Sequence, residues 1–140
     1  MGELSLFFAQ NVVAEVTEDF VVSERFKNKD GKSVPWKLRS MTEAENEEIR
    51  KSATKRVKVR TGVYTAETNT EEYMAKLIVA SVAFPDLKNA DLQKSYGVMG
   101  AELLLRKMLL PGEYTALVQK VQELNGFDQD TNELKDEVKN

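Results

Sequence analysis

The groups of this 140-residue sequence that could exchange protons in a reaction are its carboxylates and lysines, because it contains no cysteine and no histidine. These absences exclude disulfides, zinc sites built from cysteine or histidine ligands, thiol nucleophiles and a Ser-His-Asp relay. They also remove the side chain whose unperturbed pKa lies nearest neutrality. Catalysis would therefore need carboxylates or lysines whose pKa is strongly shifted by burial or close pairing.

Two pairs of adjacent carboxylates, Glu47–Glu48 and Glu71–Glu72, are the first candidates for such chemistry. Adjacent residues on a helix point in different directions, and acids near a helix N-terminus are stabilising in any case. The segment 28–33 lacks the alternating oxygen ligands of a calcium loop, and 97–100 lacks the lysine of a phosphate-binding loop. We therefore expect no catalytic residue, no metal and no cofactor.

A basic run is the strongest charged feature, since no acid lies between Glu48 and Glu67. Its cations are Arg50, Lys51, Lys55, Arg56, Lys58 and Arg60. They could contact an anion, so a small nucleic-acid-binding or regulatory module is the alternative function. No nucleic-acid motif surrounds the run and no aromatic residue lies inside it, which favours a solvated helix end and disfavours nucleic acid as a partner.

Two apolar features could contact a partner protein. Trp36, the one tryptophan, is predicted on a strand that lies at an edge or is bulged, because the preceding Pro35 cannot donate a ladder hydrogen bond. A core position is the commoner explanation, and an interface anchor is the alternative. Leu134 and Val138 lie four residues apart in an acidic tail. They could pack on the domain as one helical turn, or order when a partner binds.

Composition is that of an ordinary globular domain, with 41% apolar and 31% charged residues. The net charge of −3 favours neither nucleic acid nor a membrane surface. No apolar run is long enough to span a bilayer, and the N-terminus lacks the basic region and long apolar run of a secretion signal. We expect a cytoplasmic protein that does not bind membranes.

The N-terminal half predicts β structure around one helix. Residues 4–11 form a short helical turn with apolar side chains, and 12–40 form a hairpin whose Asp30-Gly31 supplies the turn. Thr42 and Glu45 have capping-box spacing and begin a surface helix. Alternating residues over 56–66 predict a second short β segment.

The C-terminal half predicts helices. Thr70 caps a helix that runs to Phe84 and is apolar nearly all round, as expected of a buried central helix. Shorter helices follow over 89–95, 98–110 and 113–124, and Asn125-Gly126-Phe127 forms the last cap. The sequence thus predicts one α+β domain over 1–127, with an N-terminal β-hairpin and a second short β segment packed on four or five helices. Its β-rich parts are 12–40 and 56–66, its helical parts are 42–55 and 70–125, and 128–140 is an acidic tail or frayed helix.

The order of many short pieces resembles the XkdN-like phage tail assembly chaperone family, found in PBSX-like defective prophages and contractile-tailed phages. The resemblance covers residues 4–127. The pieces in the first half are SERFK at 23–27, DGKSVPW at 30–36, MTEAE at 41–45 and RKSAT at 50–54. Those in the second half are YMAKLIVA at 73–80, LQKSYGVMGAE at 92–102, PGEY at 111–114 and VQELNGF at 121–127.

The resemblance implies a non-catalytic protein that coats the tape measure protein, keeps it soluble and recruits tail tube subunits. Such chaperones are not expected in the finished particle. A tape measure protein is a long, largely helical chain with apolar stripes, so its chaperone needs apolar grooves between helices. In many tail chaperones a ribosomal frameshift adds a second domain, which would diverge here after Phe127.

Overall fold

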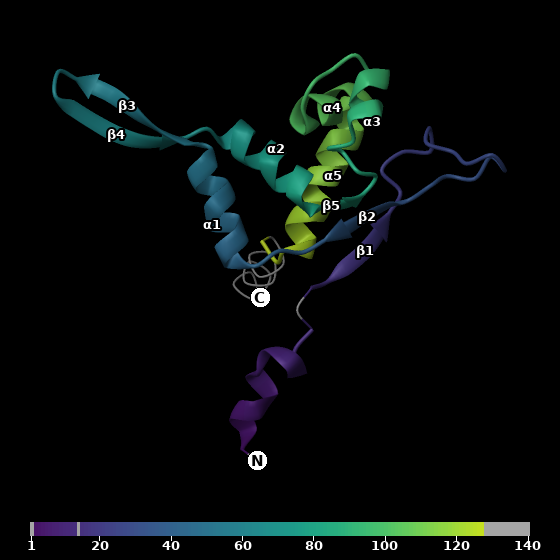
Figure 1. Cartoon of the computed structure of the whole chain (residues 1–140), viewed down its shortest axis with the longest axis horizontal. Helices are drawn as coiled ribbons and strands as arrows, with labels where there is room; N and C mark the ends of the chain where they lie inside the picture. The colour runs from purple at the N-terminus through teal and green to yellow at the C-terminus, as the bar shows by residue number, and fades with distance from the viewer. Residues whose placement is uncertain (1, 14, 128–140) are drawn as a thin grey trace, which may run out of the picture.

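A three-stranded antiparallel sheet and five helices share one apolar core in this computed structural model, which describes residues 2–13 and 15–127 (Figure 1). The elements before the long hairpin are η1 (Glu3–Phe7), η2 (Ala9–Asn11), β1 (Thr17–Phe20), β2 (Trp36–Arg39) and α1 (Glu43–Ser52). Those after them are β3 (Thr54–Arg60), β4 (Val63–Thr68), α2 (Thr70–Ser81), β5 (Val82–Phe84), α3 (Ala90–Ser95), α4 (Ala101–Met108) and α5 (Pro111–Leu124). The prediction of an α+β fold is confirmed.

The sheet has the strand order β1-β2-β5, so β2 lies in its centre. The edge position predicted for this strand is therefore wrong, and the strand is instead irregular, because its register with β5 shifts between Lys37 and Leu38. Lys37 and Leu38 pair with Phe84 and Val82 of β5. Pro35 precedes the first residue of β2, so its missing N–H costs the ladder no hydrogen bond.

The strands of the first hairpin are much shorter than the sequence predicts over 12–40. Only 17–20 and 36–39 form the ladder. A long connection covers 21–35 and closes in the expected turn, where the Asn28 amide donates to the Lys32 carbonyl at 2.9 Å. Gly31 has a φ of +78°, the left-handed conformation for which glycine is suited.

The central helix also ends earlier than predicted. α2 stops at Ser81, and the next three residues pair with β2 as β5. The residue before a proline is disfavoured in helical conformation, which limits the helix ahead of Pro85. At its start the cap is Asn69 and not Thr70, because the Asn69 side chain accepts from the Glu72 amide at 3.0 Å.

Helix α1 begins as the spacing predicts, with a complete capping box between Thr42 and Glu45. Helix α4 starts at Ala101, three residues later than predicted, since Gly100 has a φ of +107°. None of the helices in the described part of the chain is long and apolar enough to cross a membrane.

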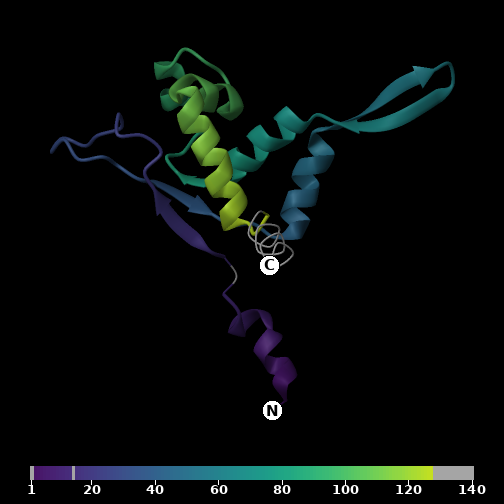
Figure 2. The ribbon, with the colours of Figure 1, turned by 180° about the vertical axis from the view of Figure 1, so that it is seen from behind.

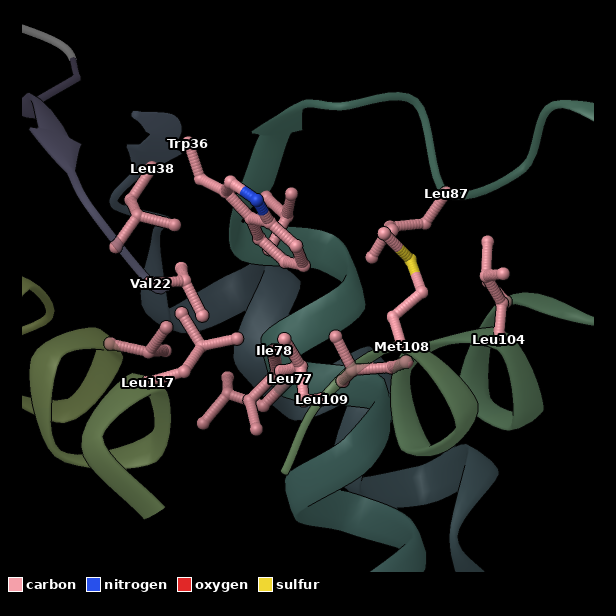
Figure 3. Packing of buried hydrophobic residues seen from close by; sticks show 14 residues of the cluster. Val22, Trp36, Leu38, Leu77, Ile78, Leu87, Leu104, Met108, Leu109 and Leu117 are labelled. Carbon is pink, nitrogen blue, oxygen red and sulfur yellow. The ribbon is translucent and has the colours of Figure 1, made fainter. Parts of the chain in front are cut away.

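The core lies where α2, α4 and α5 meet the sheet (Figure 3). α2 contributes Leu77 and Ile78, which are 1% and 0% exposed. Side chains from the sheet, the other helices and the connections surround them, namely Val22, Trp36, Leu38, Val82, Leu87, Ala101, Leu104, Leu105, Met108, Leu109, Leu117 and Val121. The apolar character of α2 on nearly all sides therefore reflects its central position.

Replacing Trp36 by alanine should lower the free energy of unfolding by about 3–5 kcal/mol, because the indole is 2% exposed and its removal leaves a cavity. The neighbouring Lys37→Ala, exposed on the opposite face of the same strand, should change stability by less than about 0.5 kcal/mol. Urea unfolding followed by circular dichroism measures both. Equal stability of the two variants would contradict the core position of Trp36.

Candidate partner-binding site

Three surfaces of the described chain could bind another protein: a groove between two helices, the β3–β4 hairpin and the N-terminal segment. Figures 1 and 2 show the last two projecting away from the body in different directions. No cluster of three or more Asp or Glu residues that could hold a metal ion occurs among residues 2–13 and 15–127.

The α2–α5 groove has a volume of about 570 Å³ and lies between the first turns of these two helices. Its apolar lining is Met74, Leu109, Pro111 and Tyr114, of which Leu109 is buried and Pro111 is exposed. Polar side chains that reach solvent complete it, namely Thr70, Glu71, Arg106 and Thr115. An apolar interior with a few charged or hydroxyl groups around it is typical of a site for an apolar ligand or peptide.

Arg25 holds the corner where α4 ends and α5 begins, and this corner forms one wall of the groove. Its Nη2 donates to the Met108 carbonyl at 2.9 Å and to Glu113 Oε1 at 2.6 Å. Its Nε donates to Glu113 Oε2 at 3.3 Å, so the contact with the carboxylate is bidentate. One side chain of the long 21–35 connection thus positions the start of α5.

The Arg25 guanidinium lowers the pKa of Glu113 to about 2. The Leu110 amide adds to the effect by donating to Glu113 Oε1 at 2.9 Å, which also completes the cap of α5. The carboxylate is therefore ionised across the ordinary pH range. Sequence analysis missed this contact, because the two residues lie 88 positions apart and no local pattern connects them.

The β3–β4 hairpin carries four of the predicted anion-contacting cations, Lys55, Arg56, Lys58 and Arg60, all exposed. Every residue of β4 is exposed too, so neither face of the hairpin is covered by the rest of the described chain. The Arg56 guanidinium lies 4.9 Å from the centre of the Tyr64 ring. The fold therefore brings an aromatic residue beside the basic run, although none lies inside it in the sequence.

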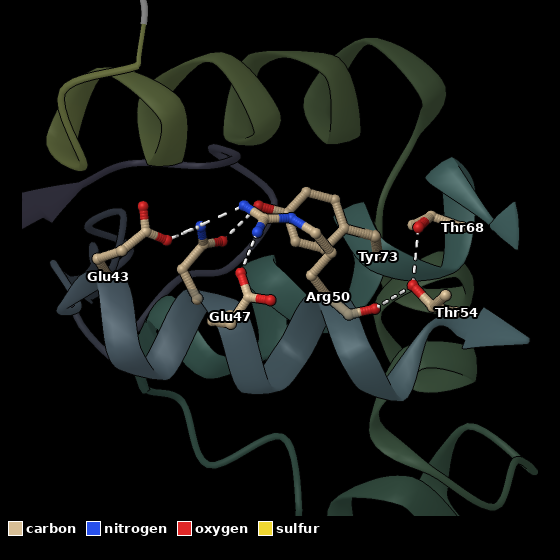
Figure 4. A network of polar contacts seen from close by, with 7 residues as sticks. Glu43, Glu47, Arg50, Thr54, Thr68 and Tyr73 are labelled. Carbon is tan, nitrogen blue, oxygen red and sulfur yellow. Dashed lines mark hydrogen bonds and ion pairs between the residues drawn. The ribbon is translucent and has the colours of Figure 1, made fainter. Parts of the chain in front are cut away.

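Arg50 has a different environment from the hairpin cations (Figure 4). It forms an ion pair with Glu47, lies 3.9 Å from Glu43 and stacks 5.9 Å from the Tyr73 ring of α2. Its carbonyl accepts from the Thr54 hydroxyl at 2.7 Å, which joins α1 to the base of the hairpin. Arg50 thus anchors the hairpin, whereas Lys51 is exposed at the end of α1.

The remaining predicted contact residues are Trp36, Leu134 and Val138. Trp36 is in the core, 2% exposed and 5.9 Å from the Phe26 ring. In this conformation its indole offers almost no surface to a partner. Leu134 and Val138 lie outside the described residues. Trp36 is not among the residues that line the α2–α5 groove.

The depressed pKa of Glu113 predicts a pH-dependent contribution to stability. Glu113→Gln should lower the urea midpoint at pH 7, where the carboxylate pairs with Arg25. Because the folded-state pKa is about 2 and an ordinary glutamate titrates near ~4.3, the contribution is present above that pH and is lost as the pH falls through 2. The difference in urea midpoint between the wild type and Glu113→Gln should therefore narrow as the pH is lowered from 5 to 2. A difference that stays constant over this range would contradict the ion pair.

Comparison with known proteins identifies the family of the chain. The family model described as "Phage XkdN-like tail assembly chaperone protein, TAC" matches residues 4–139. Two proteins of Bacillus subtilis (strain 168) are each 27% identical over 139 residues, or 99% of this chain. They are "Phage-like element PBSX protein XkdN" and "Uncharacterized protein YqbN", of which 94% and 93% are covered.

The fold also has a counterpart among solved structures. A crystal structure of the protein YqbN superimposes with a TM-score of 0.77 at 24% identity, covering 91% of this chain and 99% of that one. Likeness at this identity shows the arrangement of helices and strands alone. The family is shown by the match to the family model. The resemblance noted in the sequence is therefore confirmed: this chain belongs to the XkdN-like phage tail assembly chaperone family.

Proposed function

We propose that this chaperone binds the tape measure protein, keeps it soluble and recruits tail tube subunits to it, without catalysing a reaction. It would act in the cytoplasm of the bacterial host and be absent from the finished particle. Membership of the tail assembly chaperone family supports a role in building the tail. The observation that carries the choice of client is the α2–α5 groove.

An amphipathic helix fits such a groove by inserting apolar side chains that recur every three or four residues. Met74 and Tyr114 are half-buried, so they present apolar surface while remaining fixed by the helices that carry them. Glu71 and Arg106, of opposite charge, are exposed at the groove. They can pair with the polar flank of a helix and set its direction, since rim charges orient a partner more than they add affinity.

Tail tube subunits are the second partner of this proposal, and the β3–β4 hairpin is the surface we assign to them. The hairpin projects away from the body, as both ribbon views show (Figures 1 and 2). It carries four cations and one acid, Glu67, and exposes the apolar Val59 and Tyr64. An acidic surface on the partner would complement it. The base of the hairpin adjoins the groove at Thr70, but its tip projects away from the body, so one chaperone could hold both partners.

The groove assignment predicts the outcome of co-expression with the tape measure protein. The wild-type chain should raise the soluble fraction of the tape measure protein and copurify with it. Thr115→Arg places a long cation at the groove and should reduce both at least tenfold. Gln119→Arg adds the same side chain one turn further along α5, at an exposed position outside the lining, and should behave as wild type.

Tape measure protein that stays equally insoluble with and without the chaperone would overturn the proposed function. Equal loss of copurification in the two arginine variants would overturn only the groove assignment. Circular dichroism of both variants checks that they fold.

The hairpin assignment predicts a selective loss. Lys58→Glu/Arg60→Glu reverses two charges at the tip of the hairpin and should weaken binding of the tail tube protein at least tenfold in a pull-down at ~0.1 M salt, where surface charges are partly screened. Binding of the tape measure protein should not change. Lys88→Glu/Lys94→Glu makes the same charge change at exposed positions away from the hairpin and is the control. Tube binding that is equal in both double variants would contradict the assignment.

A further inference from the structure

The N-terminal segment, residues 3–13, is an apolar surface that the rest of the described chain leaves uncovered. Leu4, Leu6, Phe7 and Val13 are 71%, 67%, 77% and 80% exposed. Neither of its two short 3-10 helices contains a buried residue. A cluster of large apolar side chains of this kind on a folded protein marks a contact surface. We call this segment the arm.

The arm has a defined shape without support from the body. The Ser5 amide donates to the Gly2 carbonyl at 3.2 Å, and the Asn11 side-chain amide donates to the Ser5 carbonyl at 2.7 Å. These contacts are local, so they shape the arm but cover none of its apolar side chains. An arm with local order and exposed apolar groups loses less conformational entropy on docking than a disordered one.

The α2–α5 groove is the matching apolar surface on the body, and the arm of the same chain points away from it. In both ribbon views the arm leaves the body on the side opposite the first turns of α2 and α5 (Figures 1 and 2). The arm and the groove of one chain are thus both uncovered and lie far from each other. A second copy of the chain would supply a groove for the arm and an arm for the groove.

We propose that the arm of one chain docks in the α2–α5 groove of a second copy. The first 3-10 helix of the arm presents Leu4, Leu6 and Phe7, and a groove of about 570 Å³ is large enough for several apolar side chains. Charge agrees as well, because Glu3 is the only ionisable side chain of residues 3–13. It would meet Arg106, which is exposed at the groove.

Exchange of arms in both directions gives a closed dimer with a two-fold axis, which leaves no arm or groove uncovered. The docking itself does not depend on the proposed function. The role of the docked arm does rest on the proposed function: the arm covers the groove until an apolar helix of the tape measure protein displaces the arm. The test therefore uses the chaperone alone, so that failure of either proposal can be recognised separately.

Disulfide cross-linking tests the arrangement cleanly, because the chain has no cysteine of its own. Chains carrying Phe7→Cys are mixed with larger, tagged chains carrying Thr115→Cys, oxidised, and separated by size without reductant. A mixed dimer is expected. Asp30→Cys, equally exposed but at the tip of the 28–32 turn, replaces Thr115→Cys in the control and should give at least tenfold less mixed dimer.

Sedimentation equilibrium of the full-length chain supplies the second measurement. The wild type should self-associate, and Leu6→Ser/Phe7→Ser should weaken this at least tenfold while its circular dichroism spectrum stays that of the folded chain, because neither side chain is buried within a single copy. Monomeric wild-type protein at every soluble concentration would overturn the proposal. So would unchanged association of the serine variant, or equal cross-linking of Phe7→Cys to the control position. A third contradicting result would be a disulfide within one chain when Phe7→Cys and Thr115→Cys are combined in the same chain.

Discussion

The structure depends on burying one helix that is apolar on nearly every side. α2 carries a single charge between Tyr73 and Ser81, Lys76, so almost any exposed face would place apolar surface in water. α1, α4, α5 and β5 all pack against it, and together they remove Leu77 and Ile78 from solvent. The groove is found where this covering ends. Near the start of α2 the neighbouring helices no longer cover it fully, and Met74 is only half-buried.

A single side chain from the 21–35 connection holds the corner that forms one wall of the groove. Arg25 joins the end of α4 to the start of α5 through Met108 and Glu113. Its guanidinium lies outside the core, so the corner is held by directional hydrogen bonds and charge, whereas α2 is held by apolar burial. The proposed binding groove therefore lies between a helix held by apolar burial and a corner held by hydrogen bonds and an ion pair.

The two projecting parts of the molecule differ in chemistry. The hairpin is rich in cations and is anchored at its base by a network through Arg50, Asn46 and Tyr73, in which the buried Asn46 donates to Glu43 at 2.8 Å (Figure 4). The arm carries one charge and several large apolar residues. Charged and apolar projecting surfaces are thus separated in space, as the proposed binding of two different partners would require.

Local sequence alone determined the features that depend on neighbouring residues. The capping box at Thr42, the Asn89 cap and the left-handed Gly31 and Gly126 follow from side-chain chemistry within a few positions, as did the α+β class. The family could also be identified from the order of short pieces.

Tertiary structure decided the rest. β5 forms because β2 offers its second edge, which also makes β2 central and buries Trp36. Arg25 and Glu113 meet across 88 positions, and the groove between α2 and α5 arises from the packing of distant helices, which local patterns do not encode.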